Sequence, residues 1–199
     1  MGNMSREEAS EVIREYVPLF RRFDELGVDY CLVGGLAVML NAIDFIDARY
    51  RMTYDADVML DDTFDNADMV QAYLDVYASD PDTSAAVYDA TVGLAPECLF
   101  DDEDGRLGAT RICGATEELD GVSTPDLDVV RFLNGKTLET LKRKTVLFEG
   151  TPIVVATAGQ LLEMKQKTVG LLMASRAESS RPQDFEDIDM LRRLLEHGA

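Results

Sequence analysis

A four-residue apolar run, residues 30–33, ends in Gly34-Gly35 and is followed by an apolar stretch that reaches about Phe45. An apolar run of this length bounded by glycines predicts a buried strand, and the longer stretch predicts a helix from about Leu36. Glycine adopts backbone conformations that other residues avoid, so the turn and the helix N-terminus can approach a phosphate closely. The chain is therefore expected to build an α/β fold around this strand, turn and helix.

A second strand, predicted over residues 54–60, carries two aspartates at alternate positions. Asp55 and Asp57 are two residues apart, so their carboxylates share one face of an extended strand, and the residues between and beside them face a core. Carboxylate oxygens are hard ligands that suit divalent cations such as Mg²⁺. Beside the glycine turn, this pair predicts a metal-dependent site for a nucleoside triphosphate.

The order of these motifs is more informative than any one of them, because the chain has 23 aspartates and five Asp-x-Asp pairs. Gly34-Gly35, a helix and Arg51-x-Thr53-x-Asp55-x-Asp57 resemble the nucleotidyltransferase superfamily that includes DNA polymerase beta. Two C-terminal motifs resemble its AbiEii-like branch, the toxin enzymes of abortive-infection and toxin–antitoxin systems; they are Leu161-Leu-Glu-Met-Lys165 and Arg181-Pro-Gln-Asp184-Phe-Glu-Asp187-Ile. The similarity runs from about residue 28 to 195 and is thin between 65 and 120.

The resemblance implies a two-metal site with three carboxylates. Asp55 and Asp57 would bind Mg²⁺ together with the triphosphate, and a second Mg²⁺ would be shared with a carboxylate from a neighbouring strand. We choose Asp128 for that third carboxylate, because it directly precedes the apolar pair Val129-Val130. Asp126 lies on the same face of its strand and stays an open alternative.

The resemblance also implies which residues meet the nucleotide. The residues expected there are Gly34, Gly35, Arg51, Thr53 and Lys165. Lys165 would neutralise triphosphate charge as a point cation. Asp184 would either orient Lys165 or approach the acceptor, and the sequence does not choose between these roles.

The implied activity is transfer of a nucleoside monophosphate from a triphosphate to an acceptor hydroxyl on RNA, protein or a small molecule. A toxin of this kind would have an antitoxin protein as its partner. Three alternatives stay open: an aminoglycoside-type nucleotidyltransferase, a non-catalytic nucleotide-binding or interaction protein of the same fold, and a plain acidic scaffold. The sequence has no Walker loop and no Ser/His or Cys/His pair, so P-loop, hydrolase and zinc mechanisms have no support.

The chain is strongly acidic, with a formal net charge of −19 and only five lysines. Such a surface repels phosphates, which argues against unaided nucleic-acid binding and leaves that partner undecided. The acidity indicates a salt-adapted source, or a cationic substrate or partner. No apolar stretch is long enough to span a bilayer, and the three cysteines are widely spaced, so we expect a cytoplasmic protein with reduced thiols.

The expected architecture is α/β: a small mixed sheet with helices on one face, plus a C-terminal helical part. Residues 1–156 would form the nucleotidyltransferase core, and residues 157–199 would form helices that complete the site. The other predicted elements are a helix from Ser5 to Leu26 that Pro18 kinks or splits, a helix over 65–79, strands over 106–114 and 125–133, a hairpin around Glu149-Gly150, and helices from Ala158 and Arg181-Pro182. Residues 85–99 fit a helix or a strand.

Overall fold

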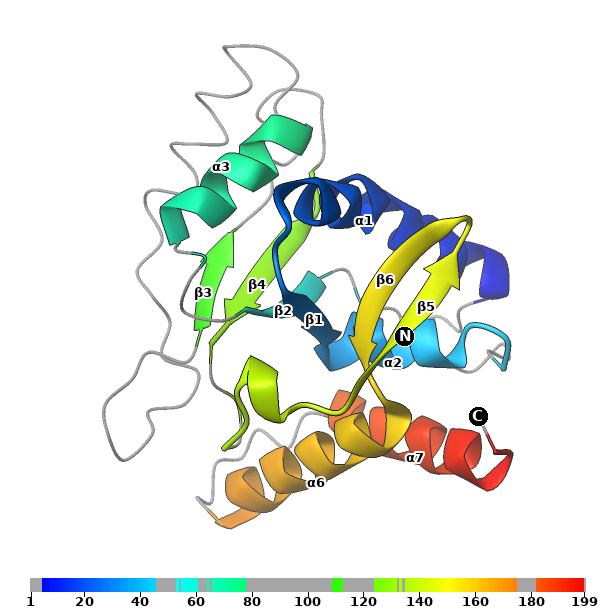
Figure 1. Ribbon diagram of the computed structural model, residues 1–199. Coiled ribbons are helices and arrows are strands. Elements are labelled where there is room, and N and C mark those ends of the chain that lie inside the picture. Colours follow the sequence, from blue (N-terminus) through cyan, green and yellow to red (C-terminus); the bar gives the residue numbers. More distant parts are fainter. Residues whose placement is uncertain are drawn as a thin grey trace.

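The computed structural model describes residues 5–45, 53, 55–60, 64, 66–77, 109–112, 124–131, 133, 135–174 and 182–198. The predictions for Arg51, for residues 85–99 and for Arg181 lie outside these ranges. Within them the chain forms one mixed sheet with helices packed against it (Figure 1). The predicted α/β class is therefore confirmed.

In the part of the chain that the structure describes, six strands form the sheet in the order β3-β4-β2-β1-β6-β5. Their bounds are β1 Tyr30–Val33, β2 Asp55–Leu60, β3 Ala109–Ile112, β4 Asp126–Val130, β5 Arg143–Phe148 and β6 Thr151–Ala156. The β1–β6 and β2–β4 pairs are parallel, and the β1–β2, β3–β4 and β5–β6 pairs are antiparallel. The two central strands, β1 and β2, thus run in opposite directions, which brings the end of β1 beside the beginning of β2.

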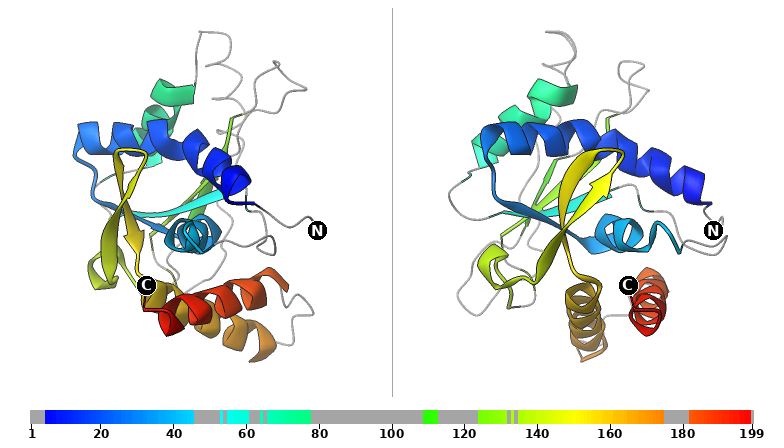
Figure 2. Two further views of the ribbon diagram at one scale, coloured as in Figure 1. Left: turned by 90° about the vertical axis from the view of Figure 1, so that its right-hand side faces the viewer. Right: turned by 45° about the vertical axis from the view of Figure 1, so that its right-hand side comes forward.

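Helices cover both faces of the sheet, so the prediction of helices on one face is wrong. Their bounds are α1 Arg6–Leu26, α2 Gly34–Ala42, α3 Asn66–Tyr77, α6 Ala158–Ala174 and α7 Pro182–Glu196, with a short 3₁₀ helix, η1, at Leu138–Thr140. Figures 1 and 2 show α1 and α3 on one side of the sheet and α2, α6 and α7 on the other. The reason is that β1 is buried at all four positions, so both of its faces need apolar cover.

The first helix shows how local signals and packing combine. Ser5 and Glu8 form a reciprocal capping box at its start, and Gly27 ends it with a left-handed φ of 67°. Pro18 lies inside α1, yet the helix is continuous and is not split there. An interior proline costs about 3 kcal/mol, and the buried apolar stripe on both sides of Pro18 outweighs that cost.

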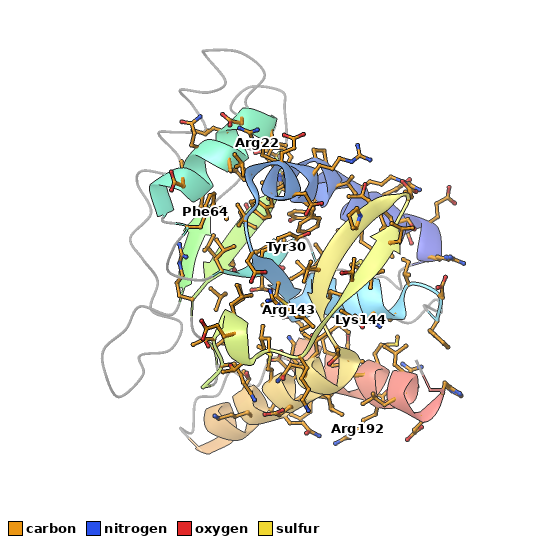
Figure 3. All side chains as sticks on the ribbon, in the orientation of Figure 1. Arg22, Tyr30, Phe64, Arg143, Lys144 and Arg192 are labelled. Atoms are coloured by element: carbon orange, nitrogen blue, oxygen red, sulfur yellow. The ribbon has the colours of Figure 1, made fainter. Side chains whose placement is uncertain are left out.

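An aromatic cluster joins α1 to the sheet and sets the orientation of β1. Tyr30 stacks on Phe20 with ring centroids 5.6 Å apart and contacts Phe23 at 5.2 Å. Figure 3 shows Tyr30 between α1 and the sheet, and its hydroxyl accepts a hydrogen bond from the Val154 N–H at 3.4 Å. Because side chains alternate along a strand, Tyr30 facing α1 leaves Val33 on the opposite face.

Two turns at strand ends follow from backbone chemistry. The β5–β6 hairpin turns through Glu149 at φ 48° and Gly150 at φ 83°, which matches the two-residue turn predicted there. Strand β4 ends at Val130, earlier than predicted, because the chain then folds back through an isolated bridge between Leu133 and Lys136, with Gly135 at φ 79°. Among the described residues, no helix is long and apolar enough to cross a membrane.

We expect Phe20→Ala to lower the free energy of unfolding by about 3–5 kcal/mol, because it removes a fully buried ring from the α1 cluster. Phe185→Ala is the matched control, since the Phe185 ring is 47% exposed and should cost less than about 1 kcal/mol. Urea unfolding followed by circular dichroism measures both. Equal losses for the two variants would show that the α1 cluster is not the principal core contact of this face.

Candidate active site

The turn between β1 and α2 is shaped around one carboxylate. Gly34 is the first residue of α2 and has a φ of 65°, a left-handed conformation that favours glycine. A Cβ added to Gly34 would lie 1.7 Å from Oδ2 and 2.5 Å from Cγ of Asp57, so the carboxylate occupies the space of a side chain. The close approach predicted for this glycine turn is therefore made by Asp57 in the protein itself.

The position of Asp57 also suits the electrostatics of α2. The N-cap residue, Val33, makes no side-chain cap, and Val33 is the register partner of Asp57 in the β1–β2 pair. The first N–H groups of a helix lack intrahelical acceptors and carry partial positive charge. An anion at this point is therefore stabilised, whether it is the Asp57 carboxylate or a phosphate beside it.

Four aspartates lie on one face of β2 and β4. The parallel register pairs Asp55 with Asp126 and Asp57 with Asp128, and paired residues of adjacent strands point to the same side. Since Val33 pairs with Asp57, this face is the one opposite α1. Asp128 is buried, with 3% of its surface exposed, and the other three are half-buried.

Asp128 lies beside Asp57, and Asp126 lies beside Asp55. Each of the two candidates for the third carboxylate is therefore next to one member of the Asp55/Asp57 pair. On its other side Asp128 pairs in register with Arg111 of β3. Within the described part of the chain, no three His, Cys, Asp or Glu side chains converge closely enough to hold an ion.

The residues around the aspartates hold them in place. The Thr53 hydroxyl is buried and donates to Asp55 Oδ1 at 2.7 Å, so Thr53 orients a carboxylate in addition to any role toward a nucleotide. Sequence reasoning missed two tyrosines that fix the start of β4. Tyr16 donates to the Asp126 carbonyl at 2.8 Å, and Tyr73 donates to the Pro125 carbonyl at 2.7 Å.

Tyr16 stays a hydrogen-bond donor over the whole physiological range. Burial raises the pKa of its phenol most, and the nearby charges of Tyr77, Asp55 and Asp126 raise it further. A phenol in this setting keeps its proton, so the contact between α1 and the start of β4 does not titrate near neutral pH.

A second group of charged residues joins α6 to α7. Lys165 Nζ lies 2.8 Å from Asp184 Oδ1 and 2.8 Å from Asp187 Oδ2. The side chains are 16%, 8% and 0% exposed, in that order, so this lysine does not extend into water. The predicted proximity of Lys165 and Asp184 agrees with this contact, and Asp187 is a third member that sequence reasoning did not assign.

The charges around Lys165 determine its protonation state. Burial alone lowers the pKa of the Lys165 ammonium, but the charges of Asp187 and Asp184 and their hydrogen bonds outweigh burial, so the net pKa is raised. A raised lysine pKa stabilises the fold at every pH below the unfolded value of about 10.4 and loses that effect only at higher pH. The lysine thus stays charged throughout the neutral range.

The two groups lie on the same side of the sheet. The aspartate face is opposite α1, and α2, α6 and α7 lie on that side (Figure 2). Helix α2 contacts both β2 and the α6–α7 pair, and its first residue is Gly34. The structure therefore joins Gly34, Asp55, Asp57 and Asp128 in one group and Lys165, Asp184 and Asp187 in another, with α2 packed against both.

Comparisons with known proteins give a likeness of fold. No family model matches the chain, and no curated protein matches it in sequence. An antigenic nucleotidyltransferase-like protein of Paracoccidioides brasiliensis aligns with a TM-score of 0.54 at 19% identity, over 98% of this chain and 79% of that one. A candidate nucleotidyltransferase of Thermotoga maritima aligns over 98% of this chain and 97% of its own, at 14% identity and a TM-score of 0.44. The first alignment shows that the chain has the fold of a nucleotidyltransferase-like protein.

We expect Gly34→Ala to lower the free energy of unfolding by more than the strain of a left-handed backbone alone would explain. Gly150→Ala is the matched control, because Gly150 has a similar positive φ and nothing lies within 4 Å of an added Cβ. The control should cost about 1–2 kcal/mol for left-handed strain, and Gly34→Ala a further ~1–3 kcal/mol for overlap with Asp57. In the double variant Gly34→Ala/Asp57→Ala, much of that further loss of stability should be recovered, because the overlapping carboxylate is gone. Urea unfolding measures all variants, and additive losses for the two substitutions would contradict the contact.

We expect Lys165→Ala to destabilise the protein by about 3–5 kcal/mol, because it leaves two buried carboxylates without their cation. Lys167→Ala, two residues further along the same helix and exposed, should cost less than about 1 kcal/mol. Adding Asp184→Asn and Asp187→Asn to Lys165→Met should restore most of the stability. Thermal unfolding tests this series, and a Lys165→Ala variant as stable as the wild type would exclude the buried ion-pair role.

Proposed function

We propose that the chain is a metal-dependent nucleotidyltransferase that moves a nucleoside monophosphate from a triphosphate to an acceptor hydroxyl. The observation that carries the proposal is the packing of Asp57 against Gly34, with Asp128 as the register partner of Asp57 on a parallel strand. This arrangement sets carboxylates and a helix N-terminus side by side, as a site for a metal–triphosphate complex needs. The likeness of fold to a nucleotidyltransferase-like protein supports the same activity.

The donor chemistry fits Mg²⁺. Asp55, Asp57 and Asp128 offer oxygen ligands from one face of two adjacent strands, and a divalent cation would offset the repulsion between them. Two bound ions would stabilise the attacking and leaving oxygens of an in-line displacement. We assign Asp55 and Asp57 to the ion that accompanies the triphosphate, and Asp128 to the second ion.

The residues of the chain itself would position the nucleotide. The α2 N-terminus at Gly34-Gly35 presents backbone N–H groups toward phosphate oxygens, and Thr53 holds Asp55 in its rotamer through the 2.7 Å hydrogen bond. Lys165 and its two aspartates carry a combined charge of −1, so they would not attract a triphosphate as a unit. The Lys165–Asp184 contact supports the role of Asp184 as the residue that orients Lys165.

We further infer that the chain belongs to the AbiEii-like branch. The two C-terminal motifs that carry this resemblance meet in the contact between Lys165 and Asp184, which are 19 residues apart in sequence. A toxin of that branch would act in the cytoplasm with an antitoxin protein as its partner. The proposal for this branch rests on the C-terminal motifs and is separate from the proposal of nucleotidyl transfer.

The proposed activity predicts Mg²⁺-dependent binding of a non-hydrolysable triphosphate, measured by isothermal titration calorimetry. Asp57→Asn should weaken that binding at least about tenfold, because it removes a charged ligand worth more than ~1.4 kcal/mol. Asp189→Asn is the control, since Asp189 is an exposed aspartate on α7. Affinity that does not respond to Mg²⁺ or to Asp57→Asn would refute the site.

Turnover separates the two candidates for the third carboxylate. Asp128→Asn should abolish transfer and Asp126→Asn should reduce it less, because Asp128 is the register partner of Asp57. Release of pyrophosphate in the presence of acceptor measures both variants. Loss of activity in the Asp126 variant alone would assign the third carboxylate to Asp126.

A further inference from the structure

Strand β5 forms one edge of the sheet. It is the last strand in the order β3-β4-β2-β1-β6-β5, and Figure 1 shows it outside β6. In the part of the chain that the structure describes, β6 is its one paired neighbour, so the outer side of β5 carries no further strand. An edge of this kind presents a row of backbone N–H and C=O groups that can bind another strand.

The hydrogen bonds to β6 determine which residues of β5 face the outer side. The Thr157 N–H donates to the Lys142 carbonyl at 2.9 Å, and these two residues continue the β5–β6 register by one pair. Residues of an antiparallel strand alternate between hydrogen-bonded and non-hydrogen-bonded pairs. The even-numbered residues of β5 therefore bond to β6, whereas Arg143, Thr145 and Leu147 direct their N–H and C=O groups outward.

On the α1 face of the sheet, the side chains along this edge are cationic. Tyr30 packs on α1, and Leu32 lies on the same face as Tyr30. The register continues that face from Leu32 through Val155 to Lys144, and Lys142 shares it. Both lysines are exposed, and among the described residues neither forms an ion pair.

On the opposite face, the same edge is apolar. Leu147 is 72% exposed, and its register partner Pro152 is also exposed. Arg143 lies on this face too, at the beginning of β5 (Figure 3), but Asp29 neutralises it, with Nη2 donating to Oδ2 at 2.9 Å. A strand added at this edge would therefore meet positive charge on one face and an apolar surface on the other.

A second copy of the chain does not match this pattern. In a two-fold pairing of β5 with its copy, outward-directed residues must oppose one another, so odd-numbered residues lie opposite odd-numbered ones. The two registers with the most overlap centre on Thr145 or on Val146. They set Lys144 opposite Val146 or Phe148 of the copy, where it meets no carboxylate. Charge complementarity thus favours an acidic strand from a different protein.

We propose that the outer edge of β5 binds an extended segment of a partner protein in which acidic and apolar residues alternate. The segment would add a strand about 4.8 Å from β5. Because side chains alternate along a strand, its acidic residues would lie beside Lys142 and Lys144, and its apolar residues beside Leu147 and Pro152. The site is separate from the proposed transfer activity and needs neither Mg²⁺ nor a triphosphate.

The acidity of the whole chain does not prevent this contact. The net charge of −19 repels an acidic segment at long range. That repulsion is largely screened beyond about 8 Å at physiological ionic strength. The two lysines, in contrast, would touch the segment directly, so their attraction is screened less.

The test measures binding of a fluorescein-labelled peptide of alternating glutamate and valine, by anisotropy at physiological ionic strength. The wild type should bind it, and Lys142→Glu/Lys144→Glu should weaken binding at least about tenfold, because attractive cross-strand pairs become repulsive. Arg6→Glu/Arg192→Glu is the matched control, since both arginines are exposed, lie away from β5 and give the same change in net charge. This control should bind the peptide as the wild type does.

A second arm tests the backbone of the edge. Thr145→Pro removes one outward N–H and no hydrogen bond to β6, so the fold should tolerate it and binding should be lost. Thr145→Val keeps the N–H and should bind as the wild type does. An N-methylated form of the peptide cannot donate backbone hydrogen bonds and should not bind, which tests the same contact without changing the protein.

Each other outcome overturns the proposal. Absence of binding to the alternating peptide, or unchanged affinity in Lys142→Glu/Lys144→Glu, would remove the site. Equal binding of the N-methylated peptide, or of a peptide with the same residues in two separate blocks, would show attraction by charge without an added strand. A dimer in analytical ultracentrifugation that Thr145→Pro dissociates would assign the edge to a second copy of the chain.

Discussion

The contact between Gly34 and Asp57 is the constraint on which the rest of this site depends. It exists because β1 and β2 are antiparallel neighbours with Val33 opposite Asp57, and because the chain turns into α2 at a residue without a side chain. The same register sets Asp57 beside Asp128 through the parallel β2–β4 pair. A shift of one residue in either pairing would move Asp57 to the α1 face, where the core is apolar. The apolar pattern of the strands thus fixes the chemistry of the opposite face.

Burial on both sides of the central strands explains why the C-terminal helices belong to this arrangement. Strand β1 is buried throughout, and α2 packs against it on the face of the sheet opposite α1. Helices α6 and α7 pack in turn against α2 and form a further layer there. Apolar side chains of α7 such as Leu191 and Leu194 are buried in that layer, and the ion pairs of Lys165 tie its two helices together. A buried lysine with two carboxylates is stable only while all three are present, so this cluster fixes how α6 and α7 pack.

Sequence patterns predicted the elements whose signals are local, and they failed where tertiary contacts decide. The strand over residues 30–33 and the Glu149-Gly150 hairpin are confirmed, because apolar runs and turn residues act over short distances. The apolar pattern predicts the start of α2 at about Leu36, whereas the structure begins the helix at Gly34, where Asp57 packs against the backbone. Two features depend on packing between segments that are distant in sequence: the helices on the second face of the sheet, and the contact of Asp187 with Lys165. Asp187 follows Asp184 by three residues, and residues three apart are neighbours on a helix surface. This spacing is the sequence feature that could have identified Asp187.

The aspartate pairs across β2 and β4 set like charges side by side. Like charges directly opposite each other on adjacent strands are unfavourable, by roughly 0.2–1 kcal/mol per pair, and this sheet has two such pairs in succession, Asp55 with Asp126 and Asp57 with Asp128. An apolar residue at any of these positions would relieve the repulsion and extend the core. A divalent cation reverses the sign of the interaction, because carboxylates that repel one another become shared ligands. This exchange of repulsion for shared ligands is a physical reason for the proposal that the face binds a cation.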